Sequence, residues 1–116
     1  MVKKEIVIPI YDFRIILILS DDFGYDVKNE ANYNEDTNGA SAVTLTYPDH
    51  VNLLSIVFDR ENISSGGVAH EALHATNKIM VSLGIKPDLN NDEAQCYLLG
   101  FIVDCIYNII DNESND

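Results

Sequence analysis

His70 and His74 are the residues whose types and spacing point most directly to chemistry. They belong to residues 68–74, VAHEALH, which we expect to lie in an amphipathic helix. Two helical residues four positions apart lie about 40° apart around the axis and about one turn apart along it, so both imidazoles can reach one ion. The spacing therefore predicts half of a zinc site, which needs a third protein ligand if one position is to stay open for water.

Glu93 is the best candidate for the third ligand because it lies at the start of the next helix. A short turn would fold that helix back across the first, and Gly100 on the same strip would let the two backbones approach closely. Glu93 also fits a capping box with Asn90, so its carboxylate has an alternative structural role. Asp92 is the second candidate for the third ligand, and His50 is a more distant one.

Glu71 follows the first histidine directly, roughly 100° around the helix, so it flanks the metal position without pointing straight at it. This placement suits a general base better than a fourth ligand. Zinc would polarise a carbonyl and lower the pKa of a bound water, and Glu71 would take the proton and return it to a leaving amine. The structural alternative is that Glu71 is an exposed helix former.

These residues resemble a zincin, specifically the gluzincin branch that includes thermolysin. The resemblance covers about residues 68–104. It rests on the HEALH stretch and on residues 91–94 of the next helix, NDEA. In that branch a glutamate about 20 residues after the second histidine completes the zinc site, and Glu93 falls 19 residues after His74. The fuller pattern is also similar to small proteins that are encoded by bacteriophages and prophages and described as metallopeptidases.

The resemblance implies that His70, His74 and Glu93 bind Zn²⁺ and that Glu71 is the catalytic carboxylate. It also implies a minimal zincin fold, in which a small sheet lies over the motif helix and an edge strand aligns a peptide by strand addition. We expect residues 51–58 to supply that edge strand.

The sequence departs from the larger gluzincins at two points. They place an aspartate four residues after the third ligand to hold a ligand histidine, whereas Tyr97 stands there in this sequence. They also carry transition-state donors in a C-terminal subdomain that this sequence does not contain. Tyr97, Tyr47 and His50 are the candidates to replace those donors, and the alternative for each is a packed or surface residue.

Hydrophobic patterning predicts an α+β domain with a small, mainly antiparallel sheet of about four strands packed on two long helices. Apolar or alternating runs indicate strands at residues 6–10, 13–19, 40–47 and 51–58. The turn between the last two runs predicts an antiparallel hairpin. The polar stretch 25–38 is compatible with either a loop or a short helix.

The first long helix is expected at about residues 66–83, with Ser64 or Ser65 as its N-cap and Gly84 at its C-terminal end. Its apolar stripe would pack on the sheet and leave the histidine pair nearly opposite. The second long helix is expected at about residues 90–110.

We expect one domain over residues 1–111, followed by a frayed polar tail over residues 112–116. With 19 Asp and Glu against 7 Lys and Arg, the formal net charge is -12. Phosphate backbones and anionic lipid would repel such a chain, so we expect neither nucleic acid nor a membrane as a partner.

No signal-peptide pattern and no run of about 20 apolar residues is found in the sequence. Cys96 and Cys105 would lie some 13 Å apart on opposite faces of one helix, too far for a disulfide. These observations predict a cytoplasmic protein.

The residues together predict a zinc-dependent metallopeptidase or amidase that acts on a peptide or protein substrate. Glu71 would activate metal-bound water to attack the peptide or amide carbonyl. One alternative is a non-catalytic zincin-fold module that binds metal or captures a protein partner. Another is that the histidine spacing is accidental. Two imidazoles and a carboxylate suit several divalent ions, of which zinc fits the motif best.

Overall fold

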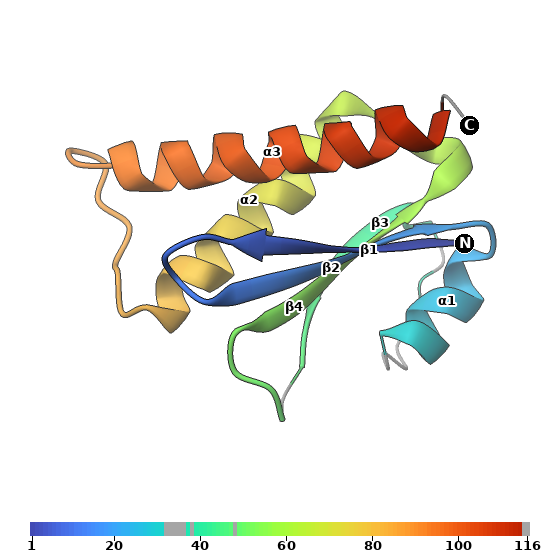
Figure 1. Cartoon of the computed structure of the whole chain (residues 1–116), viewed down its shortest axis with the longest axis horizontal. Coiled ribbons are helices and arrows are strands. Elements are labelled where there is room, and N and C mark those ends of the chain that lie inside the picture. Colours follow the sequence, from blue (N-terminus) through green and yellow to red (C-terminus); the bar gives the residue numbers. More distant parts are fainter. Residues whose placement is uncertain (32–36, 38, 48, 115–116) are drawn as a thin grey trace.

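A four-stranded sheet forms the central layer of the computed structural model of the chain (Figure 1). The structure describes residues 1–31, 37, 39–47 and 49–114. In chain order the elements are β1 (Val2–Ile8), β2 (Phe13–Ser20), α1 (Phe23–Glu30), β3 (Ala42–Thr46), β4 (Leu53–Asp59), a 3-10 turn (Arg60–Asn62), α2 (Ser65–Ser82) and α3 (Glu93–Ser114). The predicted α+β class, the four strands and the two long helices are confirmed.

The order of the strands across the sheet is β1-β2-β4-β3. The β1–β2 and β3–β4 pairs are antiparallel, which confirms the predicted hairpin of the third and fourth strands, while β2 and β4 pair in parallel. The expected edge strand at residues 51–58 is wrong, because β4 lies between β2 and β3. Residues 54–58 are all buried, as is typical of an interior strand that is covered on both faces. The edges of the sheet are therefore β1 and β3.

Helices cover both faces of the sheet (Figure 1). The face toward α2 and α3 contributes the larger apolar core, whose strand residues are Ile6, Ile8, Phe13, Ile15, Leu17, Leu19, Leu54, Ile56 and Phe58. The opposite face packs Ile18, Leu45 and Val57 against Val27 and Ala31 at α1. The polar stretch after β2 thus contains a short helix. Residues 32–36 and 38 of that stretch lie outside the described residues.

The boundaries of α2 agree closely with the prediction. Ser64 is its N-cap, since the Ser64 hydroxyl accepts a hydrogen bond from the Gly67 N–H at 3.0 Å. Gly84 follows the C-cap residue Leu83 with a φ of 75°, a left-handed conformation that glycine adopts without strain.

The second long helix differs from its prediction at both ends. Asp88 organises the approach to α3, because its side chain accepts from the Asn90 N–H at 2.9 Å and its carbonyl accepts from the Asn91 N–H at 3.1 Å. The helix then begins at Glu93 and continues to Ser114. Residues 112–114 of the expected frayed tail are therefore helical, and residues 115–116 are not described.

By length and composition alone, α3 is apolar enough to cross a membrane, and it is the single helix of this kind in the described part of the chain. This is weak support for a membrane location, because a helix that packs against a core passes the same test. Leu98, Ile102 and Ile106 of α3 are buried against the sheet.

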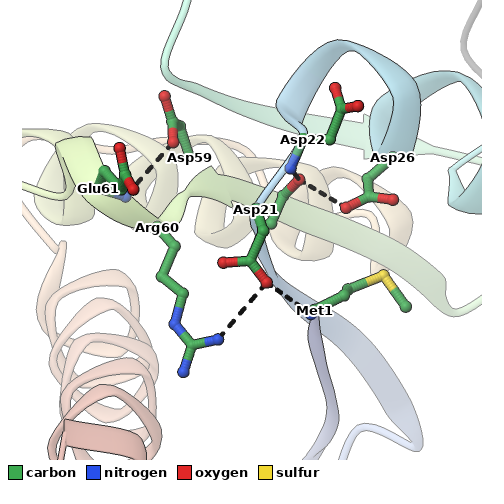
Figure 2. A network of polar contacts seen from close by, with 8 residues as sticks. Met1, Asp21, Asp22, Asp26, Asp59, Arg60 and Glu61 are labelled. Carbon is green, nitrogen blue, oxygen red and sulfur yellow. Dashed lines mark hydrogen bonds and ion pairs between the residues drawn. The ribbon is translucent and has the colours of Figure 1, made fainter.

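Polar contacts join the end of β2 to the start of α1 and the end of β4 (Figure 2). The buried Ser20 hydroxyl donates to Asp26 Oδ2 at 2.6 Å and accepts from the Asp22 N–H at 3.1 Å. Asp21 binds the Met1 amino group at 2.8 Å and lies 3.8 Å from Arg60. The hydrogen bond and positive charge of the Met1 amino group, together with Arg60, hold the pKa of the Asp21 carboxyl below its ordinary value. Of these contacts, the bond from Ser20 to Asp26 joins β2 directly to α1.

Candidate metal site

The two histidines of the motif meet on the exposed face of α2. Their Nε2 atoms are 3.2 Å apart, and their rings cross at 74° with centroids 4.8 Å apart. Two nitrogen ligands of a tetrahedral zinc ion, each about 2.0–2.1 Å from the metal, lie roughly 3.3 Å apart. The pair therefore has the separation required of two adjacent zinc ligands. One N–H···N hydrogen bond between neutral imidazoles has a similar length, so the separation alone does not distinguish the two arrangements.

Glu71 is buried, which excludes the alternative that it is merely an exposed helix former. Its Oε1 accepts a hydrogen bond from the Thr44 hydroxyl at 2.9 Å, and its Oε2 lies 3.8 Å from His70 Nε2. Thr44 belongs to β3, so this hydrogen bond connects the edge of the sheet to the motif helix. The carboxylate is thus positioned beside one imidazole by a contact from another element of the fold.

Glu93 lies apart from the histidine pair. It is exposed at the first residue of α3, and its side chain makes no hydrogen bond or ion pair with any residue that the structure describes. Within residues 1–31, 37, 39–47 and 49–114, no group of three or more His, Cys, Asp or Glu side chains is arranged to hold a metal ion. The structure therefore brings together His70, His74 and Glu71 of the predicted site, without Glu93.

The rotation of α3 explains the position of Glu93. The helix buries Leu98, Ile102 and Ile106, and the free energy gained by burying these side chains sets which side faces the core. Glu93 falls on the strip of Tyr97, Gly100 and Asp104, as the sequence predicted, but that strip is exposed, and Tyr97 is 76% accessible to solvent. A hydrogen bond of 2.7 Å from Gln95 Nε2 to Asn77 Oδ1 joins the start of α3 to α2.

The other candidate ligands and donors make no contact with His70 or His74 among the described interactions. Asp92 is half-buried, and its carbonyl accepts from the Cys96 N–H at 2.9 Å at the start of α3. His50 contacts Tyr47 edge to face, with ring centroids 6.1 Å apart, between β3 and β4. Neither His50 nor Tyr47 forms a polar contact with the motif in the described structure.

A groove adjoins the site on the side of His74. It has a volume of about 460 Å³ and lies between the end of β3 and the second half of α2. We call it the Lys78 groove; its lining residues are Thr46, His74, Asn77, Lys78, Val81 and Ser82.

Sequence reasoning missed Thr44 and Lys78. The alternation of β3 places Thr44 and Thr46 on the same face, and Lys78 follows His74 by one helical turn, so part of the signal was present. The missing information was that β3, rather than β4, is the edge strand that contacts the polar side of α2 at Glu71.

No protein-family model, curated protein or solved structure matches the chain.

Replacing Thr44 with Val should lower the free energy of unfolding by about 1–3 kcal/mol, because the buried Glu71 carboxylate loses its hydroxyl donor. Urea denaturation followed by circular dichroism measures the change. Thr46→Val is the matched control, since Thr46 is exposed on the same face of the same strand, and its effect should stay within about 0.5 kcal/mol. Equal effects of the two substitutions would show that the hydrogen bond to Glu71 contributes no stability.

Proposed function

We propose that this protein is a zinc-dependent metallopeptidase or amidase of the zincin type. The observation that carries the proposal is the 3.2 Å separation of the His70 and His74 Nε2 atoms on an exposed helix face, with the Glu71 carboxylate 3.8 Å from His70. If the histidine spacing were accidental, a buried carboxylate oriented by β3 beside the pair would not be expected. The motif, its helix and this carboxylate together favour metal-dependent hydrolysis.

His70 and His74 would hold zinc through their Nε2 atoms, and we propose Glu93 as the third protein ligand. Glu93 would have to approach the pair from its present position at the start of α3. Residues 81–91, which run from the last residues of α2 to the approach to α3, are all exposed. Few packing contacts therefore hold the N-terminal end of α3 in place. Binding free energy of the metal would then be coupled to a local rearrangement of the chain.

Glu71 would act as the general base and then as the general acid. Zinc, when bound, polarises the substrate carbonyl and makes water more acidic. Thr44 holds Oε1 of Glu71, whereas Oε2 faces His70 and is free to take the proton of the attacking water. The same oxygen would return that proton to the nitrogen of the leaving amine.

The substrate would bind along β3. Among the described residues this strand pairs with β4 on one side only, so its other side offers backbone N–H and C=O groups that no described strand pairs with. An extended peptide can add to such an edge by main-chain hydrogen bonds. Thr44 places this edge next to Glu71, which would bring a peptide carbonyl close to the catalytic carboxylate.

Zinc content tests the ligand assignment. The parent protein, purified without a histidine tag, should contain about one zinc per chain by inductively coupled plasma mass spectrometry. His70→Ala and His74→Ala should each lose most of it, because a site with three protein ligands would lose one. His50→Ala is the control, since this third histidine lies outside the pair, and it should retain the metal. Equal zinc content in all four proteins would contradict the assignment.

Glu71→Gln tests the catalytic role. It should retain zinc while the rate of peptide hydrolysis falls by about 10²–10⁴-fold, since an amide cannot accept the proton. A screen of fluorogenic peptides identifies a substrate, on which the rates are compared. Glu61→Gln, at an exposed carboxylate in the 3-10 turn before α2, should keep the parent rate. A zinc-loaded Glu71→Gln variant with the activity of the parent would refute the mechanism.

A non-catalytic metal-binding or interaction module is the second candidate function, and the exposed position of Glu93 favours it. Zinc affinity distinguishes the two. If Glu93 completes a catalytic site, Glu93→Gln should weaken zinc binding by roughly tenfold or more in a competition titration with a chromogenic chelator. The control Glu113→Gln, near the opposite end of α3, should leave the affinity unchanged. An unchanged affinity in Glu93→Gln, together with no hydrolysis in the peptide screen, would support the module.

A further inference from the structure

The Lys78 groove is lined by side chains with hydrogen-bond donors that have no acceptor among the described residues. Lys78 is half-buried, and its ammonium group forms no ion pair or hydrogen bond with any of them. Asn77 uses its Oδ1 to accept from Gln95, which leaves its Nδ2 group without a partner among the residues described. Thr46 lines the same groove and carries a hydroxyl group. An ammonium, an amide N–H and a hydroxyl together form a donor set that suits a carboxylate.

Lys78 differs from the other unpaired lysines by its burial. Of the seven Lys and Arg, Lys3, Arg14 and Arg60 each lie within 4 Å of a carboxylate. The lysines without an ion pair to a described residue are Lys4, Lys28, Lys78 and Lys86, and of these Lys78 alone is half-buried whereas the others are exposed. A cation that is partly removed from water gains most from a counter-ion, yet none of the described carboxylates approaches Lys78. A negatively charged ligand group would supply the missing partner.

The position of Lys78 relates the groove to the metal site. His70, His74 and Lys78 follow one another at intervals of four residues, so they share one side of α2. Lys78 lies about 6 Å beyond His74 along the helix axis. An extended peptide advances about 3.3–3.6 Å per residue, so a group held at Lys78 would lie one or two residues from a bond held at the histidine pair.

We infer that the Lys78 groove anchors a carboxylate of the substrate, so that the protein acts on peptides or amides with an acidic group one or two residues from the cleaved bond. This inference rests on the proposed hydrolase function for its account of what is cleaved. The carboxylate is either an Asp or Glu side chain or the C-terminus of the peptide, since both present the same anion. Val81, which is 69% exposed at the groove, would contact the apolar part of the same residue.

Peptide binding to the metal-free protein tests the anchor independently of zinc and catalysis. The probes are fluorescein-labelled tetrapeptide mixtures in four forms, with Glu or Gln at a fixed internal position and with a free or an amidated C-terminus. Fluorescence anisotropy should show at least one carboxylate form binding about tenfold more tightly than the doubly neutral form. A preference for internal Glu identifies a side-chain anchor, and a preference for the free C-terminus identifies a terminal anchor.

Variants of Lys78 assign that preference to the groove. Lys78→Met keeps the aliphatic length without the charge and should remove the preference, whereas Lys78→Arg should retain most of it. Lys86→Met is the control, because Lys86 is exposed beyond the C-terminus of α2 and does not line the groove. Circular dichroism confirms that each variant is folded.

The outcomes separate this inference from the proposed function. A carboxylate preference that survives in Lys78→Met, or the absence of any preference in the parent, would overturn the anchor even if the protein hydrolyses peptides. A Lys78-dependent preference in a protein that binds no zinc and cleaves nothing would establish the groove as a carboxylate site and refute the hydrolase.

Discussion

Packing of α2 against the sheet is the constraint on which the candidate site depends. Its buried stripe consists of Val68, Ala72, Ala75 and Ile79, each with no exposed surface. Small alanine side chains allow the helix to approach the sheet closely, and the tight packing leaves little freedom to rotate about the axis. That fixed rotation turns Glu71 toward β3 and leaves the histidines facing outward. A rotation of about 100° in one direction would bury both imidazoles, and in the other direction it would expose the carboxylate.

The second determinant is the mixed topology of the sheet. Because β4 is apolar on both faces, it occupies an interior position and pairs with β2 in parallel and with β3 antiparallel. This arrangement places the shorter, threonine-containing strand at the edge, beside α2. The hydroxyl of Thr44 then reaches the carboxylate of Glu71, so a polar side chain of the edge strand becomes part of the site.

Sequence patterns predicted the elements well, because period-2 and period-3.6 patterns report local burial. They also placed His70 and His74 together, since a separation of four residues determines proximity within one helix. The edge strand was predicted wrongly because strand order depends on the whole sheet. The position of Glu93 apart from the pair was beyond local patterns too, because it depends on how α3 rotates to bury Leu98, Ile102 and Ile106. The Thr44–Glu71 contact joins positions 27 residues apart and carries no pairwise signal in one sequence.

The open side of β3 also bears on self-association. Unpaired backbone groups form a template on which a second copy could build an intermolecular sheet. This strand has only five residues, which limits the length of any such pairing. Each copy carries a formal charge of -12, so two molecules repel one another as they approach. Salt shortens the range of that repulsion to about 8 Å at physiological ionic strength, and aggregation through this strand would become easier as the salt concentration rises.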